Sequence, residues 1–152
     1  MSLKIREAAA GEIQTLLDFE QAIICVERPF DNSLQEGKIR YYDLIELMQS
    51  KKALVLVAEV AGEIVGSGYA KIMKAKKHQK FSAYAYLGFM YVKPNFRGQS
   101  INNKIIQILI DWAKTKKMSE IRLEVYDQNY SAKNAYLKAG FKPNLVEMRL
   151  EI

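Results

Sequence analysis

The hydrophobic and polar positions of this chain follow two periods, one typical of strands and one typical of helices. Residues 3–6 can pair as a short first strand, and apolar residues at helical spacing over 13–24 predict an amphipathic helix that ends near Pro29. The charges and turn formers of residues 27–33 predict a loop, and helical character resumes over residues 42–50. The amino-terminal third therefore predicts one strand and two helices.

The pattern in the middle of the chain predicts strands. Residues 53–60 are rich in β-branched side chains, Ala61-Gly62 is a two-residue turn, and residues 64–73 continue as the antiparallel partner. A long strand is predicted over residues 81–92, where Gly88 interrupts the pattern. A glycine inside a strand indicates a bulge or a close backbone approach, so we expect one there.

The last third alternates again between the two periods. It predicts, in order, a helix, a strand, a helix and a strand over residues 101–116, 121–126, 131–139 and 146–152. The strands 81–92 and 121–126 flank a helix, so they should lie parallel through a right-handed crossover. The whole pattern predicts a single domain over residues 1–152 of the α/β (α+β mixed) class, with a mixed, mostly antiparallel central sheet and helices on both faces. Ligands in such sheets favour the carboxyl ends of parallel strands, here Val92 and Tyr126.

Composition narrows the class of protein and the compartment. The chain has 152 residues, of which 49% are hydrophobic, and a formal net charge of +6. These values indicate one folded domain and suit an anionic partner, but they do not choose among a nucleotide cofactor, a nucleic acid and an acidic protein. Cys25 is the one cysteine, no signal-peptide stretch precedes the first strand, and no apolar run approaches the roughly 20 residues of a membrane span. We therefore expect a soluble cytoplasmic protein without a membrane partner.

The turn over residues 97–102 has the features of an anion site. Backbone N–H groups that enter a helix lack intrahelical partners, and the positive end of the helix dipole lies beside them. Arg97 and Lys104 add positive charge. An ordinary turn capped by Ser100 or Asn102 is the alternative interpretation.

The predicted helix over 131–139 presents an unusually small face. Ala132, Ala135, Tyr136 and Ala139 lie at helical spacing, and small side chains allow close approach. Gly140 suits a left-handed C-cap. By spacing alone Tyr136 is a core aromatic residue with a satisfied hydroxyl. The neighbouring anion turn favours a catalytic phenol instead.

Together these residues resemble a known family. A strand, Arg97-x-x-Ser100-x-Asn102, a helix, a strand and then Asn129-x-x-Ala132-x-x-x-Tyr136-x-x-x-Gly140-Phe141 is similar to the GNAT superfamily of acetyl-coenzyme A dependent N-acetyltransferases. The family pattern has Gly at the position of Ser100 and Gly or Ala at that of Asn102. Every residue except proline has a backbone N–H group, so Ser100 and Asn102 keep the donors of the turn. What the larger side chains can change is how closely a phosphate approaches those donors.

The resemblance implies a role for each matching position. The residues assigned to the pyrophosphate of acetyl-coenzyme A are Arg97, Gly98, Gln99, Ser100, Ile101 and Asn102. Met90 and Val92 would offer backbone groups to the thioester and the pantetheine arm, and Asn129 would hydrogen-bond that arm. Tyr136 would protonate the departing thiolate, since a phenol with an ordinary pKa near 10 is a proton donor at neutral pH.

The amine acceptor must lose a proton, so a general base is required. Glu124 resembles by position the glutamate proposed as base in bacterial ribosomal-protein alanine N-acetyltransferases. A solvated carboxylate paired with Arg122 or a lysine is the alternative. Tyr86 stands where some histone acetyltransferases carry a glutamate, so with Tyr84 it is predicted to be a groove wall.

The acceptor pocket is predicted from residues 27–42 and the loop 74–80. There Glu27 and Asp31 could hold a cationic amine, although a solvated loop explains them equally well. The lysines of the loop could contact nucleic acid or an acidic protein, but a solvated hairpin tip is favoured. His78 has no companion at metal-ligand spacing, so no metal site is predicted.

The sequence thus predicts an N-acetyltransferase that moves acetyl from acetyl-coenzyme A, its cosubstrate, to a primary amine by direct attack. The acceptor is a small molecule or the amino terminus or lysine of a protein or peptide. A coenzyme A binding regulatory domain without turnover is the alternative from another class. A nucleic-acid binding module is supported only by net charge. Monomer and homodimer both stay open.

Overall fold

The computed structural model describes residues 2–152, so Met1 lies outside the described chain. Its strands are β1 (Leu3–Glu7), β2 (Ala53–Val60), β3 (Glu63–Lys74), β4 (Ala83–Val92) and β5 (Ile121–Arg122). Its α-helices are α1 (Ile13–Glu27), α2 (Leu44–Gln49), α3 (Ile101–Thr115) and α4 (Tyr130–Lys138). The strands form one sheet in chain order, antiparallel from β1 to β4 and parallel between β4 and β5. This confirms the predicted mixed, mostly antiparallel sheet.

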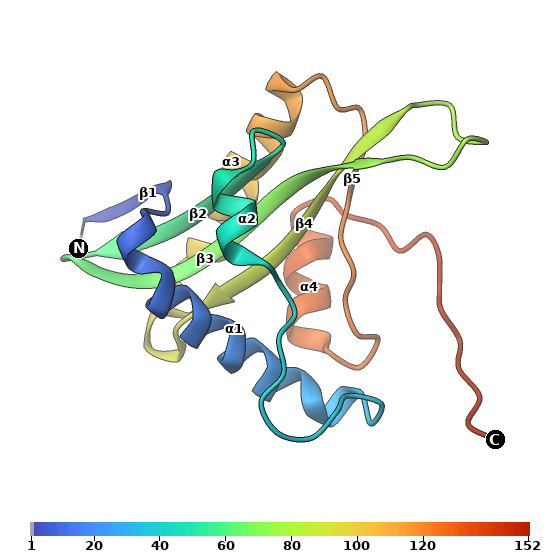
Figure 1. Ribbon diagram of the computed structural model, residues 1–152, viewed down its shortest axis with the longest axis horizontal. Coiled ribbons are helices and arrows are strands. Elements are labelled where there is room, and N and C mark those ends of the chain that lie inside the picture. Colours follow the sequence, from blue (N-terminus) through green and yellow to red (C-terminus); the bar gives the residue numbers. More distant parts are fainter. Residues whose placement is uncertain (1) are drawn as a thin grey trace.

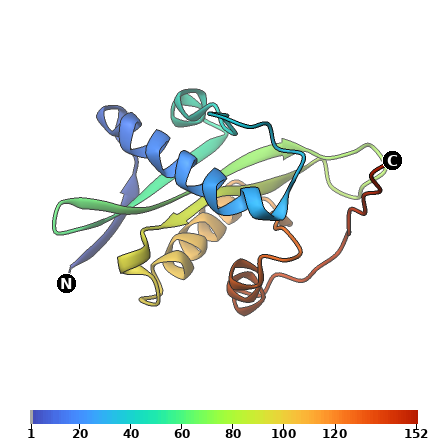
Figure 2. The ribbon, with the colours of Figure 1, turned by 90° about the horizontal axis from the view of Figure 1, so that it is seen from below.

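Helices cover both faces of the sheet, as Figures 1 and 2 show. The apolar stripe of α1, with Leu16 and Phe19, packs with α2 against Val57 and Phe89 on one face. On the other face α3 buries Ile105 and its neighbours against β2, β3 and β4. Helix α4 lies on this second side, where Tyr136 and Ala139 join the same core. No helix among residues 2–152 is long and apolar enough to cross a membrane.

A bulge interrupts the pairing of β3 with β4. Ser67 pairs with Tyr91 while Tyr69 pairs with Gly88, so β4 carries one extra residue between these two pairs. The Ser67 hydroxyl donates to the Phe89 carbonyl oxygen at 3.0 Å, and Phe89 adopts a φ of 58°. A Cβ on Gly88 would stand 2.6 Å from the Tyr69 hydroxyl. The structure therefore confirms both a bulge and a close approach at this glycine.

The parallel pairing of β4 with β5 is much shorter than predicted. It consists of Ala85 opposite Ile121 and Tyr86 opposite Arg122, so the predicted strand over 121–126 is wrong beyond its second residue. Residues 123–125 make no backbone hydrogen bond to any other residue within 2–152. Pairing stops next to the bulge, which bends β4 at Gly88. The carboxyl ends of the two parallel strands are consequently left unpaired with each other.

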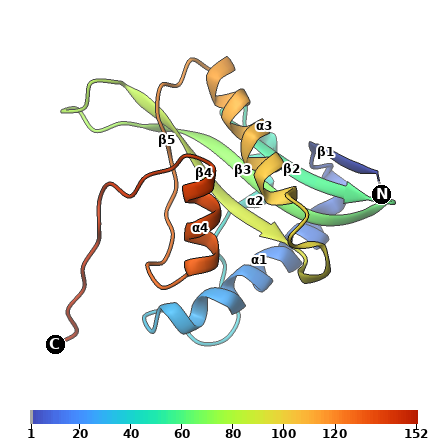
Figure 3. The same ribbon diagram turned by 180° about the vertical axis from the view of Figure 1, so that it is seen from behind.

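The predicted last strand does not form. Residues 142–152 have no regular secondary structure, and they run outside the sheet and helices, as Figures 1 and 3 show, while Arg149 pairs with Asp31. Their apolar side chains are exposed. The alternating pattern that predicted a strand is present, but a strand also requires a neighbour for its backbone groups, and the described chain supplies none.

Candidate active site

The turn before α3 has the backbone geometry of an anion site. Gly98 and Ser100 have φ values of 78° and 63°, in the left-handed region. Ser100 is the N-cap of α3, yet its side chain makes no capping hydrogen bond, and the first intrahelical bond runs from Lys104 N to Ser100 O. The N–H groups of residues 101–103 therefore have no backbone acceptor within residues 2–152. The alternative of a side-chain-capped turn is wrong.

Arg97 ties this turn to the end of β4. Its Nε donates to the Val92 carbonyl oxygen at 2.9 Å, and its guanidinium carbon lies 6.0 Å from the centre of the Tyr91 ring. The positive charge is thus held at the carboxyl end of the parallel strand. Lys104 lies one helical turn further on and lines a hollow together with Leu3 and Ile5 of β1.

Helix α4 presents Tyr136 from the side of the α3 core. Asn129 caps α4 by accepting a hydrogen bond from Ala132 N at 3.3 Å, so its side-chain oxygen is already engaged. The Tyr136 ring packs edge-on against Phe141 with ring centres 6.1 Å apart. Burial, and secondly the charge of Glu27, raise the pKa of Tyr136 to about 12. The hydroxyl therefore stays protonated at neutral pH.

Glu124 is exposed and is held by a tyrosine rather than by a cation. The Tyr86 hydroxyl donates to Glu124 Oε1 at 3.0 Å. Arg122 instead pairs with Glu120 at 2.6 Å, so the predicted alternative of an Arg122–Glu124 pair is wrong. Burial, and then the charge of Glu124, raise the pKa of the Tyr86 phenol well above its usual value. Lys71 Nζ lies 5.8 Å from the centre of the Tyr86 ring and is the nearby cation.

Glu27, at the end of α1, faces the same region. Burial raises the pKa of its carboxyl, and the negative charge of Asp31 raises it further, against the lowering effect of the Tyr41 hydroxyl. The charge of Glu27 in turn raises the pKa of Tyr136 and of Tyr42. The charge of Glu27 therefore acts on tyrosines from two segments that are far apart in the sequence. No salt bridge within residues 2–152 involves Glu27.

Asp31, the second carboxylate predicted to hold an amine, already has hydrogen-bond and ion-pair partners within the chain. It accepts hydrogen bonds from the Tyr126 hydroxyl at 2.6 Å and from Ser33 N at 3.0 Å, and it pairs with Arg149 at 2.9 Å. The side-chain hydrogen bond from Ser33, then those from Tyr126 and Arg149, hold the pKa of Asp31 far below its usual range. Asp31 therefore organises the loop after α1, and Glu27 is left as the carboxylate available to a ligand.

Glu20, a buried carboxylate on α1, supports the loop before α2 and was not among the residues predicted from the sequence. Its side chain is 0% exposed and accepts hydrogen bonds from Arg40 Nε at 2.8 Å and from the backbone N–H groups of Tyr41 and Tyr42 at 2.7 Å. This carboxylate therefore fixes the backbone at both tyrosines. The Tyr41 hydroxyl is buried without a well-formed hydrogen bond to any described residue. A charged residue on the apolar stripe of α1 was the available sequence signal.

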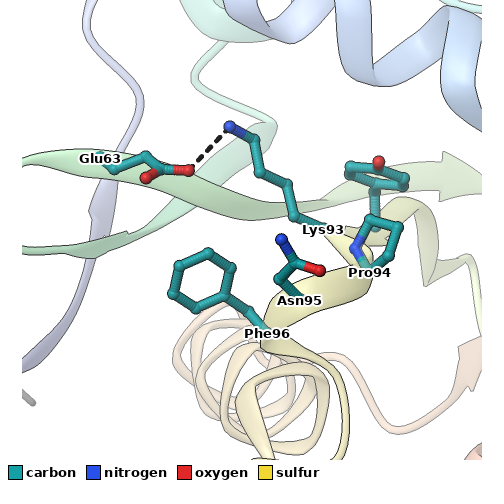
Figure 4. Close-up of a pocket in the computed structure, with 6 residues that line it drawn as sticks. Glu63, Lys93, Pro94, Asn95 and Phe96 are labelled. Carbon is teal, nitrogen blue, oxygen red and sulfur yellow. Dashed lines mark hydrogen bonds and ion pairs between the residues drawn. The ribbon is translucent and has the colours of Figure 1, made fainter.

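One hollow of the surface lies apart from the predicted site. It has a volume of about 350 Å³ and is lined by Glu63, Tyr91, Lys93, Pro94, Asn95 and Phe96. Figure 4 shows Lys93 reaching across it to Glu63, with 2.9 Å between Nζ and Oε2. It adjoins the chain that leads into the anion turn but contains no residue of the predicted site. The lysine-rich loop 74–80 also lies apart, at the far tip of the β3–β4 hairpin (Figure 1).

Comparison with known proteins assigns the family. The family model described as "Acetyltransferase (GNAT) family" matches residues 21–141, so the chain belongs to that family. Thialysine N-epsilon-acetyltransferase of Bos taurus is 44% identical over 55 residues, which is 36% of this chain and 32% of the bovine protein. N-alpha-acetyltransferase 30 of Saccharomyces cerevisiae is 31% identical over 70 residues, 46% of this chain and 40% of the yeast protein. The matches thus span well under half of these relatives.

Solved structures share the fold over nearly the whole chain. A Bacillus halodurans protein superposes with a TM-score of 0.87 at 19% identity, covering 98% of this chain and 99% of that one. A predicted acetyltransferase from Clostridium acetobutylicum, solved with acetyl-CoA, gives a TM-score of 0.76 at 18% identity, covering 99% and 96%. The resemblance inferred from the sequence is therefore confirmed at the level of family and fold. The roles of individual site residues stay predictions.

Proposed function

We propose that this protein is an N-acetyltransferase that moves the acetyl group of acetyl-coenzyme A to the primary amine of a cationic acceptor by direct attack. One observation carries the proposal. The parallel strands β4 and β5 part after Arg122, the start of α3 is uncapped, and the charge of Glu27 acts on the Tyr136 phenol, while neither Glu27 nor Glu124 makes a salt bridge within residues 2–152. The family assignment and the acetyl-CoA bound by the Clostridium acetobutylicum protein support acetyl-coenzyme A as the cosubstrate.

The cofactor would be held chiefly by backbone groups. Free N–H groups at the start of α3, with the helix dipole and Arg97, suit a pyrophosphate. The unpaired edge of β4 from Met90 to Val92 would face the pantetheine arm, and a donor aimed at the thioester oxygen would be worth roughly 3 kcal/mol in the transition state. Asn129 retains its amide N–H groups for the arm, since its capping contact uses only the oxygen.

The reaction needs a base for the acceptor ammonium and an acid for the departing thiolate. The acceptor ammonium gives a proton to a carboxylate, and the free amine attacks the carbonyl carbon. The carbon–sulfur bond then breaks, the thiolate takes a proton from the Tyr136 phenol, and the amide nitrogen sheds its surplus proton to return that phenol to its neutral form. Glu124, held by Tyr86, is the proposed base, and its exposure gives it a route to water for proton release.

The acceptor is inferred to be cationic from the chemistry of the lining. Glu27 and Glu124 carry negative charge without a salt bridge in the described chain, and tyrosine rings surround them. The buried Tyr41 hydroxyl lies near Glu27 and adds a polar group beside that carboxylate. These features suit an ammonium. The yeast N-alpha-acetyltransferase among the relatives makes a protein or peptide amino terminus the second candidate acceptor.

The first test is binding of acetyl-coenzyme A, followed by a screen of amines and peptides. A ligand at about 100 times its dissociation constant adds roughly 2.7 kcal/mol to stability, which a thermal-shift assay detects easily. Absence of a shift at millimolar cofactor would refute the acetyltransferase proposal. A clear shift without thiol release from any amine or peptide would favour the regulatory alternative.

A further inference from the structure

The β3–β4 hairpin lies in a long stretch of the chain that has no acidic residue. Residues 64–110 contain no Asp or Glu, although the whole chain has 17. Four exposed lysines of this stretch lie at the end of the hairpin and are called here the tip lysines: Lys74, Lys76, Lys77 and Lys80. None of them makes a salt bridge within residues 2–152. The tip therefore carries positive charge that the described chain does not neutralise.

The hairpin projects beyond the rest of the sheet as a two-stranded ribbon. Strand β2 pairs with β3 only as far as Lys71, and β5 pairs with β4 only from Ala85 onward. The last two register pairs of the hairpin therefore have no third strand beside them among residues 2–152. The Ala75 N–H donates to the Ser82 carbonyl oxygen at 2.9 Å, so the chain stays paired up to the tip. Figure 1 shows this ribbon extending past the other strands.

Basic segments flank the base of the ribbon on both edges. On the β2 side, the Lys52 carbonyl oxygen accepts a hydrogen bond from Ile72 N at 2.8 Å, so the exposed side chains of Lys51 and Lys52 lie beside β3. On the β5 side, the carbonyl oxygen of Glu120 accepts a hydrogen bond from Ala85 N at 3.0 Å, and the Glu120 carboxylate is already paired with an arginine. The chain reaches this point from the end of α3, which brings three more exposed lysines: Lys114, Lys116 and Lys117.

This positive charge is too distant to serve the cofactor turn. Strand β4 begins at Ala83, beside the ribbon, and ends at Val92, next to the turn. Its 10 residues, at about 3.3 Å each, separate the two ends by roughly 30 Å. The charge of the ribbon is therefore left for a different anion.

The shape of the ribbon matches the major groove of duplex DNA. That groove is about 12 Å wide and admits a two-stranded β-ribbon, and cations along both edges of the ribbon would face the phosphates on both walls. The major groove of an RNA duplex is narrow and deep, so it does not admit a ribbon in this way.

Other polyanions fit the tip less well. Single strands are bound by stacking bases on aromatic rings, but Arg122 already lies over the nearby rings, 4.0 Å from the centre of Tyr84 and 5.7 Å from that of Phe81. A protein partner needs buried apolar anchors and disfavours lysine at the centre of the interface. The large apolar side chains that are exposed in the described chain all lie outside residues 71–84.

From these observations we infer that the β3–β4 ribbon binds double-stranded DNA, with the tip lysines on phosphates and without sequence preference. Lysine acts as a point charge, and contacts to phosphates carry no direct sequence information. The binding does not depend on the proposed acetyl transfer. The solvated tip favoured by the sequence alone is the alternative, and it predicts no DNA binding at this position.

The salt dependence of binding tests the role of the tip lysines. Fluorescence anisotropy with a labelled duplex of about 20 base pairs should give a slope of log association constant against log salt concentration of about −3.6 or steeper, because four phosphate contacts contribute about −0.9 each. Lys76→Gln/Lys77→Gln should make the slope shallower by about 2 and weaken binding by on the order of tenfold near 50 mM salt.

Lys4→Gln/Lys142→Gln is the matched control, since it removes the same charge from two exposed lysines elsewhere. It should retain the parent slope, and melting temperatures check that both double variants are folded. Absence of binding near 50 mM salt at on the order of 100 µM protein, or equal losses in the two double variants, would overturn the inference.

Competition distinguishes duplex DNA from other anions. An RNA duplex and poly-L-glutamate of equal total charge should displace the labelled DNA about tenfold less well than unlabelled duplex DNA does. Equal displacement by either one would overturn the assignment to DNA. Acetyl-coenzyme A at millimolar concentration and constant ionic strength should not displace the DNA, because the cofactor turn lies at the other end of β4. Displacement by acetyl-coenzyme A would place the DNA at that turn and overturn the assignment to the ribbon.

Discussion

The two halves of the candidate site are built from different materials. The cofactor half, residues 97–102 and the start of α3, offers backbone N–H groups supplied by one continuous stretch of chain. The acceptor half consists of side chains from α1, the loop before α2, β4 and the chain after β5, gathered around Glu27 and Glu124. A site made of backbone tolerates side-chain change, whereas a site made of side chains does not. The departures at Ser100 and Asn102 fall in the tolerant half.

The largest effect is expected at Tyr136, where the two halves meet. Tyr136→Phe keeps the ring against Phe141 but removes the proton donor, so turnover should fall by on the order of 10²-fold while cofactor affinity changes little. Because the pKa of Tyr136 is raised to about 12, no loss of activity from its ionisation is expected between neutral and mildly alkaline pH.

Tyr130→Phe is the matched control, since Tyr130 lies on the same helix and is 68% exposed. It should leave turnover unchanged. Single-turnover rates and melting temperatures of both variants separate loss of chemistry from loss of folding. Parent-like turnover in folded Tyr136→Phe would mean that the phenol is structural.

Glu27→Gln should weaken binding of the amine acceptor without changing binding of the cofactor. Loss of a charge-assisted contact raises KM for a cationic amine by about tenfold, with the acetyl-coenzyme A affinity unchanged. Burial raises the pKa of Glu27 in the folded state above its ordinary 4.5, so the free energy of unfolding falls as the pH rises from the ordinary pKa to the folded pKa, and it stays lowered above that. The Gln variant should therefore melt higher than the parent near neutral pH.

This stability difference should close as the pH falls to about 4, where the carboxyl is protonated in both states. Glu36→Gln, in the exposed loop after α1, is the control and should show neither change. An unaltered KM together with an unaltered melting curve would remove Glu27 from the acceptor site.

Two substitutions at Asn102 distinguish the contribution of the backbone N–H group from that of the side chain in the cofactor half. Asn102→Ala retains the N–H group at the second position of α3 and should change acetyl-coenzyme A affinity little. Asn102→Pro removes that N–H in the first helical turn, where proline is tolerated, and should weaken affinity by about fivefold to tenfold. Calorimetry on both variants, with melting of the cofactor-free protein as a check on folding, decides the matter. Equal affinities would mean that this donor does not face the cofactor.

The smallest effect is expected at Ser100. Its φ of 63° is costly for any residue with a Cβ, so Ser100→Gly should stabilise the protein by roughly 0.5 to 1 kcal/mol. Gly98→Ser, at a φ of 78°, is the reverse experiment and should destabilise it. Urea unfolding measures both changes. If the Ser100 side chain crowds the pyrophosphate, the glycine variant also binds acetyl-coenzyme A more tightly, and if its hydroxyl donates to a phosphate, binding weakens.

The sequence by itself determined the features that depend on neighbours along the chain. The amphipathic stripes of α1 and α3, the small-faced α4, the hairpin turn at Ala61-Gly62 and the bulge at Gly88 all follow from local periodicity and backbone preference. The anion turn is of the same kind, because its donors belong to successive residues. Only the family, not the acceptor, could be inferred from these motifs.

The tertiary structure alone decided the features that depend on residues far apart. The Tyr126–Asp31 and Arg149–Asp31 contacts join positions about a hundred residues apart, and Glu20 fixes Tyr41 and Tyr42 from another segment. The predicted strands over 121–126 and 146–152 differ from the structure for the same reason. A periodic sequence makes a segment able to pair, but the pairing itself requires a neighbouring strand whose position the local sequence does not specify.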